Sequence, residues 1–109
     1  MNKYKNKKTV IDNITFSSIA EANRYKELKL LLYAKKIRNL ELQPRFTLQC
    51  AFTDNQGIKH RKIEYIADFQ YKEKGKTIVE DVKGMLTGIY KLKKKLFLYS
   101  FQDLVFREI

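Results

Sequence analysis

Two short polar segments divide the middle of the chain, and they limit its fold more than any other feature. Residues 53–57 (TDNQG) and 72–76 (KEKGK) are rich in turn-forming residues, and each lies between runs of β-prone residues. Parallel strands need a crossover of about a dozen residues, so such short turns join antiparallel neighbours. We therefore predict three successive antiparallel strands, at residues 45–52, 60–71 and 77–83.

Helical patterns lie on both sides of this strand region. In residues 18–38, Ser18 is a candidate N-cap, and Glu21 follows three residues later as in a capping box. The apolar positions Tyr25, Leu28 and Leu32 share the face of Glu21. A second amphipathic helix is predicted from the spacing of Ile89, Leu92, Leu96 and Tyr99. With a tight hairpin or an extended lead-in at residues 9–16 and a last strand at 104–108, the order predicts an α+β domain with helices covering a mixed sheet.

Size and charge narrow the class of protein. The 109 residues suit one domain, which we place at residues 9–109 after a flexible basic arm at residues 1–8. A hydrophobic content of 44% excludes a disordered chain. Lys and Arg number 23 against 12 Asp and Glu, and the resulting charge of +11 predicts a polyanionic partner. Cys50 is the only cysteine, which suits a cytoplasmic protein, and no apolar run predicts a membrane span or signal peptide.

Acidic residues at structured positions need an explanation in so basic a chain. Asp68 lies in YIADFQY and Asp81 in TIVEDVK, thirteen residues apart across one turn. Neighbouring antiparallel strands could therefore bring both carboxylates into one small volume. Period-two alternation puts Asp81 and Lys83 on one face of their strand and Glu80 on the other. Glu21, at the core-facing start of the first helix, could supply a further carboxylate.

Carboxylates held close together repel each other, and a divalent cation relieves that repulsion. Oxygen ligands favour hard ions such as Mg²⁺ or Mn²⁺, which one or two carboxylates hold together with water and substrate phosphate. A nearby lysine can stabilise charge on a phosphate or help deprotonate water. The pattern predicts a metal site of this kind.

Three segments of the sequence resemble a known protein family. The segments SSIAEANRYKELKLLLYAKKIRNLELQPRF, YIADFQY and IVEDVKG resemble a small family of phage and prophage proteins in the PD-(D/E)XK nuclease superfamily, across roughly residues 5–109. They are more distantly similar to the transposon-end nucleases and Holliday-junction resolvases of that superfamily. The resemblance implies a restriction-endonuclease-like αβββαβ core, a four-stranded mixed sheet flanked by two helices.

The resemblance also implies roles for single residues. Asp68 takes the first metal-binding position, Asp81 the second acidic position and Lys83 the place of the lysine. Glu21 takes the place of the helical glutamate. Ala67 stands where the superfamily has proline, and Asp81 where glutamate is commoner. Glu80 is adjacent, so either acid could be the ligand, although the spacing with Lys83 favours Asp81.

The expected activity is a Mg²⁺-dependent endodeoxyribonuclease, with Mn²⁺ as a substitute ion, acting in phage DNA recombination or processing. No segment resembles a base-reading element, which favours a structure-specific substrate: double-stranded DNA that is branched, such as a Holliday junction. Resolving a junction takes two active sites and therefore a homodimer. A phage-encoded protein would act in the bacterial host cytoplasm. Candidate DNA-binding residues are Lys91, Lys94, Lys95, Arg61 and Lys62.

Ordinary structural roles remain open for these residues. Glu21 could serve only the helix cap, and Asp68, Asp81 and Lys83 could form surface ion pairs. His60 has no partner for a zinc site, and we expect it to be exposed. The alternative functions are a non-catalytic basic DNA-binding module and a sequence-specific restriction-type nuclease.

Overall fold

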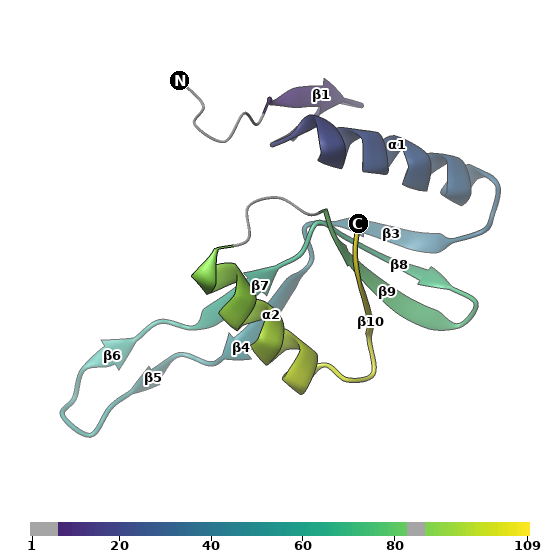
Figure 1. The fold of residues 1–109 in the computed structure, drawn as a ribbon. Helices are drawn as coiled ribbons and strands as arrows, with labels where there is room; N and C mark the ends of the chain where they lie inside the picture. Colours follow the sequence, from purple (N-terminus) through teal and green to yellow (C-terminus); the bar gives the residue numbers. More distant parts are fainter. Residues whose placement is uncertain (1–6, 83–86) are drawn as a thin grey trace.

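The computed structural model describes residues 7–82 and 87–109, so most of the predicted basic arm and Lys83 lie outside the described residues. In chain order the elements are β1 (Thr9–Ile11), β2 (Ile14–Phe16), α1 (Ile19–Tyr33), β3 (Arg38–Leu42), β4 (Arg45–Gln49), β5 (Phe52–Thr53), β6 (Lys59–His60), β7 (Ile63–Ile66), β8 (Phe69–Glu73), β9 (Lys76–Asp81), α2 (Gly88–Ser100) and β10 (Val105–Glu108) (Figure 1). Helices and a mixed sheet together make the predicted α+β fold. No helix of the described part is long and apolar enough to cross a membrane.

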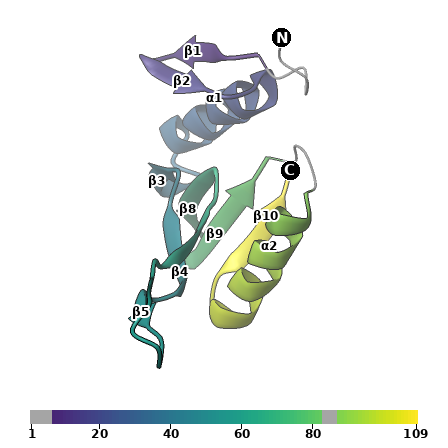
Figure 2. The same cartoon turned by 90° about the vertical axis from the view of Figure 1, so that its left-hand side faces the viewer.

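A four-stranded sheet with the strand order β10-β9-β8-β3 forms the centre of the fold. Strand β8 is antiparallel to both β3 and β9, whereas β9 and β10 are parallel and are connected through α2. Helix α1 packs on one face and α2 on the other (Figure 2). Successive residues of β9 point to opposite faces, so Ile78 joins the core under α1 and Val79 the core under α2.

Helix α1 begins as predicted and ends earlier. The backbone amide of Glu21 donates to Ser18 Oγ at 3.1 Å, which satisfies one free amide of the first turn. The prediction that the helix continues to Arg38 was wrong. Lys35 adopts a left-handed φ of 59°, the chain reverses, and Arg38 starts β3. Neither Gly nor Pro marks this end in the sequence, so composition alone extended the helix.

Of the two conformations expected for residues 9–16, the structure has the hairpin, formed by β1 and β2. Asp12 and Asn13 connect its strands with φ of 53° and 63°, the left-handed pair that a two-residue hairpin turn requires. The Tyr25 hydroxyl of α1 donates to Asp12 Oδ2 at 2.9 Å. The hairpin is thereby fixed against the first helix (Figure 2).

The predicted strand at residues 60–71 is divided into β7 and β8, and the division creates a branch in the sheet. β7 pairs with β4, whereas β8 pairs with β3 and β9. Ala67 and Asp68 lie at the break, where the amide of Ala67 donates to the carbonyl oxygen of Pro44 and that of Asp68 to the carbonyl oxygen of Glu80. Gln43 has a positive φ of 50°, and Pro44 has no amide hydrogen for the ladder. Asp68 therefore lies where two strand pairs diverge.

The buried face of α2 differs from the prediction. Ile89, Leu92 and Tyr99 were expected to pack on the sheet, but they are 70%, 58% and 77% exposed. Phe97 is fully buried instead, and its ring lies 4.8 Å from that of Phe46. Edge-to-face packing of the Phe97 ring on Phe46 accompanies this rotation of the helix, since aromatic rings bury a large apolar surface.

Candidate functional site

Asp68 is held by backbone groups at the branch of the sheet. The amide of Val82 donates to Asp68 Oδ2 at 2.6 Å. The carbonyl oxygen of Asp68 accepts from the amide of Gln43 at 3.0 Å. These bonds join Asp68 to the β3 end on one side and to the β9 end on the other, so its carboxylate has a defined position.

Asp81 lies beside Asp68, as the sequence predicted. The antiparallel register pairs Phe69 with Glu80, which puts Asp68 across from Asp81 where β8 begins and β9 ends. The two carboxyl groups share a hydrogen bond. The Tyr65 hydroxyl of β7 also donates to Asp81 Oδ2. Strands β7, β8 and β9 thus build one carboxylate pair.

Proximity and burial change the acidity of both groups. Burial, followed by the charge of Asp81, raises the pKa of Asp68 to about 8, and the charge of Glu21 contributes in the same direction. The amide of Val82 acts against this rise. Burial also raises the pKa of Asp81, opposed by its hydrogen bonds with Tyr65 and Asp68. The raised pKa values mean that the pair holds a proton more readily than separate surface carboxylates do.

Glu21 is near the pair and has a structural role as well. Its Oε1 accepts a hydrogen bond from Ser17 Oγ at 2.6 Å. Of the predicted capping box with Ser18, the bond from the Glu21 amide to Ser18 Oγ therefore forms, while the Glu21 side chain bonds to Ser17. Glu21, Gln43 and Asp68 line one cavity of about 130 Å³. The structure brings Glu21 to the same small volume as Asp68.

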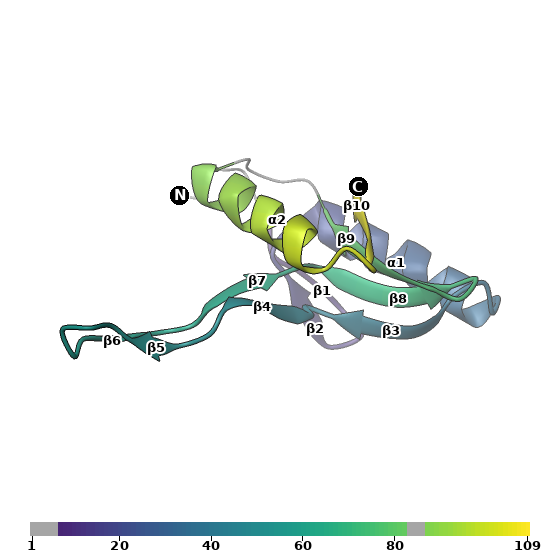
Figure 3. The same cartoon turned by 90° about the horizontal axis from the view of Figure 1, so that it is seen from below.

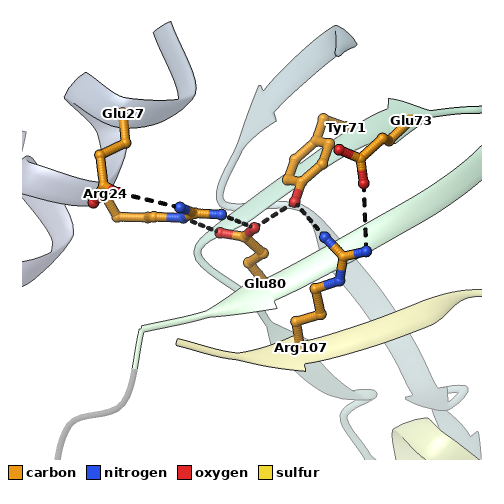
Figure 4. Close-up of polar contacts among 6 residues, drawn as sticks. All are labelled: Arg24, Glu27, Tyr71, Glu73, Glu80 and Arg107. Atoms are coloured by element: carbon orange, nitrogen blue, oxygen red, sulfur yellow. Dashed lines mark hydrogen bonds and ion pairs between the residues drawn. The ribbon is translucent and has the colours of Figure 1, made fainter. Parts of the chain in front are cut away.

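Glu80 is separated from the pair by the strand itself. Its side chain is fully buried on the α1 face, where Arg24 Nε and Nη2 donate to its two oxygens at 2.7 and 2.5 Å (Figure 4). The Tyr71 hydroxyl donates to the same carboxylate, and Arg107 donates to Tyr71 at 3.3 Å. Burial raises the pKa of Tyr71 to about 12. Of the two adjacent acids, the geometry therefore places Asp81 beside Asp68 and gives Glu80 to an internal ion pair.

A second cavity adjoins Asp81 on the α2 side. It has a volume of about 330 Å³ and is lined by Asp81, Glu64, Tyr65, Tyr90 and Lys93, among others. Sequence reasoning did not propose Tyr65 or Lys93 as site residues, whereas it placed Tyr90 near the site at the start of the second helix. The signal for Tyr65 was its place three residues before Asp68 in a strand, but its contact with Asp81 depends on the division of β7 from β8.

The candidate DNA-binding residues of α2 have different surroundings. Lys91 and Lys95 are exposed. Lys94 is not free: it donates to Glu108 Oε1 at 2.6 Å and lies 5.6 Å from the centre of the Phe106 ring. The α2 lysines thus include two that face solvent and one that joins the helix to β10.

The remaining candidates lie in or next to an extension of the β4–β7 pair. Arg61 and Lys62 are exposed, and Lys62 Nζ is 3.5 Å from Glu64 Oε2. His60 is exposed as expected, with Nε2 at 2.8 Å from Asp54 Oδ2. That contact lowers the pKa of Asp54.

The donor set of the pair fits Mg²⁺ or Mn²⁺. Asp68 and Asp81 offer carboxylate oxygens at a position where their mutual repulsion needs a counter-charge, and Mg²⁺ commonly binds one or two carboxylates and completes its shell with water and phosphate. Among residues 7–82 and 87–109, no group of three or more His, Cys, Asp or Glu side chains has the geometry of a metal site. The fit therefore rests on two carboxylates.

Comparison with known proteins places the whole chain in one family. Residues 1–109 match the model of the family described as protein of unknown function (DUF1064), and the chain belongs to that family. No curated protein and no solved structure gives a significant match.

Proposed function

We propose that this DUF1064 member is a Mg²⁺-dependent endodeoxyribonuclease that hydrolyses phosphodiester bonds at the Asp68–Asp81 pair. The observation that carries the proposal is the pair itself: two half-buried, adjacent carboxyl groups in a chain of charge +11. Two adjacent carboxylates are unfavourable unless a cation or a proton offsets their charge, and a basic surface favours a phosphate backbone as the substrate.

Each residue of the site has a part in this proposal. Asp68 and Asp81 would hold Mg²⁺ or Mn²⁺, and Glu21 would face the ion or its water. The bound ion would supply Lewis acidity that stabilises charge on the scissile phosphate. Tyr65 holds the Asp81 carboxylate in its orientation through the hydroxyl bond. Lys83 would position or activate the attacking water.

The order of elements supports a finer assignment of the fold. Helix α1, the β3–β4, β7–β8 and β9 segments, α2 and β10 follow one another as the αβββαβ core of the PD-(D/E)XK superfamily would require. In this assignment Asp68 and Asp81 occupy the two acidic positions of that superfamily. The α1 glutamate then lies on the expected helix.

A branched duplex, such as a Holliday junction, is the substrate class we infer. A junction-resolving enzyme cuts two strands and would work as a homodimer in the cytoplasm of a bacterial host. Light scattering coupled to size-exclusion chromatography tests the dimer. A mass of one chain for the free protein, together with a mass of one chain plus DNA for its complex with a four-way junction, would exclude it.

Cleavage of labelled DNA tests the activity. Four-way junction, flap and linear duplex are each incubated with the protein in Mg²⁺, Mn²⁺ or EDTA. Asp81→Asn removes a charge from the pair, and Asp103→Asn makes the same change at an exposed position. We expect metal-dependent cutting by the wild type and by Asp103→Asn, and none by Asp81→Asn. Metal-dependent cutting that persists in a folded Asp81→Asn variant would reject the proposed site.

The competing function is a basic DNA-binding module without catalysis. The observation in its favour is the Asp68 pKa of about 8, because a carboxyl pair that holds a proton at neutral pH is stable without metal. This function predicts equal binding by wild type and Asp81→Asn, no effect of EDTA, and no cutting of any substrate. A restriction-type nuclease would instead cut a plasmid into discrete fragments.

A further inference from the structure

A two-stranded arm projects from the body of the protein. We define the arm as residues 50–62, which include β5, β6 and the turn between them. It continues the β4–β7 pair away from the central sheet and from both helices (Figures 1 and 3). Of the described residues that form the two core clusters, none belongs to the arm.

The arm has a fixed conformation despite its exposure. Asp54 Oδ1 accepts from the amides of Gln56 and Ile58 at 2.9 and 3.0 Å, and Asp54 Oδ2 contacts His60. The rings of Phe52 and His60 stack with centroids 4.7 Å apart. An isolated two-stranded ribbon is marginally stable in water, so these contacts preserve a shape that the core does not require.

The chemistry of the arm suits double-stranded DNA. Its acid, Asp54, is used inside the turn, whereas Lys59 and Arg61 are exposed. The side-chain amides of Asn55 and Gln56 are exposed at the tip. A two-stranded ribbon fits the major groove of B-DNA, which is about 12 Å wide, and Asn or Gln can bond there to adenine.

The arm also has a defined relation to the carboxylate pair. It joins β7, whose Tyr65 bonds to Asp81. From Tyr65 back to Ile58 the chain makes seven steps, which at about 3.3 Å each span roughly 23 Å. At about 3.4 Å per base pair, that length corresponds to about seven base pairs of duplex.

We propose that the arm enters the major groove of duplex DNA about seven base pairs from the bond that is cut. This inference rests on the proposed nuclease function and adds a duplex-reading element that the sequence did not predict. The arm would supply affinity through Lys59 and Arg61 and base contacts through the tip.

The test compares two double variants of equal charge. Lys59→Ala/Arg61→Ala changes the arm, and Lys72→Ala/Lys76→Ala removes the same charge at exposed positions around the β8–β9 turn. Fluorescence anisotropy with a labelled 30-base-pair duplex in EDTA, at 50 to 200 mM salt, gives affinity without cutting. We expect the arm variant to bind at least about 10-fold more weakly and its salt slope to fall by about 2, since each lost phosphate contact lowers the slope by about 0.9. The control should change less than the arm variant in both respects.

A footprint separates this inference from the proposed function. Protection of guanine N7 from dimethyl sulfate, mapped on the wild-type complex in EDTA, reports occupation of the major groove. Arm-dependent protection without any cutting in Mg²⁺ would support the arm and reject the nuclease. Cutting in Mg²⁺ by a protein whose binding and protection survive the arm substitutions would overturn the inference and leave the nuclease intact.

Discussion

Replacing Asp68 with asparagine should stabilise the metal-free protein. The wild-type carboxyl is half-buried beside Asp81, and burial together with the charge of Asp81 raises its pKa from 3.8 to about 8. Asparagine keeps an oxygen for the amide of Val82 and can donate to Asp81, but it carries no charge. The substitution therefore removes a repulsion while the hydrogen bonds of the position remain.

The size of the effect depends on pH in a defined direction. Below pH 3.8 the carboxyl is protonated in both the folded and the unfolded chain, so it has no effect on the free energy of unfolding. As pH rises toward about 8, the unfolded chain has lost a proton that the folded chain keeps, and the wild type loses stability. Each pKa unit corresponds to about 1.4 kcal/mol, which sets an upper limit of about 6 kcal/mol. Because water entry and side-chain movement relax the site, we expect a gain of about 3 kcal/mol for Asp68→Asn at pH 8.

Urea unfolding from pH 4 to pH 8 in EDTA measures this gain, and urea avoids the screening of charges by guanidinium salt. The difference between variant and wild type should be near zero at pH 4 and should grow toward pH 8. Asp103→Asn, at an exposed position, should show no such growth. A difference that stays constant across the range would refute the idea that burial beside Asp81 destabilises the Asp68 carboxylate.

Three further outcomes follow from the geometry of the site. Glu80→Gln should lower the free energy of unfolding by about 3 kcal/mol, because it leaves Arg24 with the exposed Glu27 as its charged partner in place of the buried Glu80, and Arg24→Met/Glu80→Leu should recover part of that loss in urea titrations; a loss below about 1 kcal/mol for the single variant would contradict this. Tyr65→Phe should raise the Mg²⁺ concentration for half-maximal DNA cleavage about 10-fold, as removal of a group that orients a ligand does, and an unchanged Mg²⁺ titration would speak against that role. Saturating Mg²⁺ should raise the melting temperature of the wild type but not of Asp81→Asn, as differential scanning fluorimetry can show, and an equal rise in both would place the ion elsewhere.

The carboxylate pair was predictable because it depends on local rules. A short turn fixes the register of β8 and β9, and period-two alternation then separates Asp81 from Glu80. The partner of Glu80 was not predictable in the same way. Arg24 lies 56 residues earlier in the chain, and only the packing of α1 on the sheet brings the two together.

Errors arose where local pattern and tertiary packing disagree. The aliphatic stripe of α2 predicted one rotation of the helix, whereas the ring of Phe97 against Phe46 selects another. The strand at residues 60–71 looked continuous because its alternation persists through Ala67, although its pairing partner changes there. For the arm, the sequence showed only a polar turn. Whether such a hairpin projects from the body depends on whether other segments pack beside it, and the local sequence does not contain that information.

The ion pair between α1 and β9 also acts as a check on register. A slip of β9 by one residue would turn every side chain to the opposite face, so that Asp81 would take the place of Glu80 beside Arg24 and Glu80 would enter the core in the place of Val79. The shorter aspartate could not reproduce both bonds that Arg24 makes with Glu80, at 2.7 and 2.5 Å. Helix α1, which lies on the opposite face of the sheet from Asp81, therefore disfavours any register of β9 that would displace the Asp81 carboxylate.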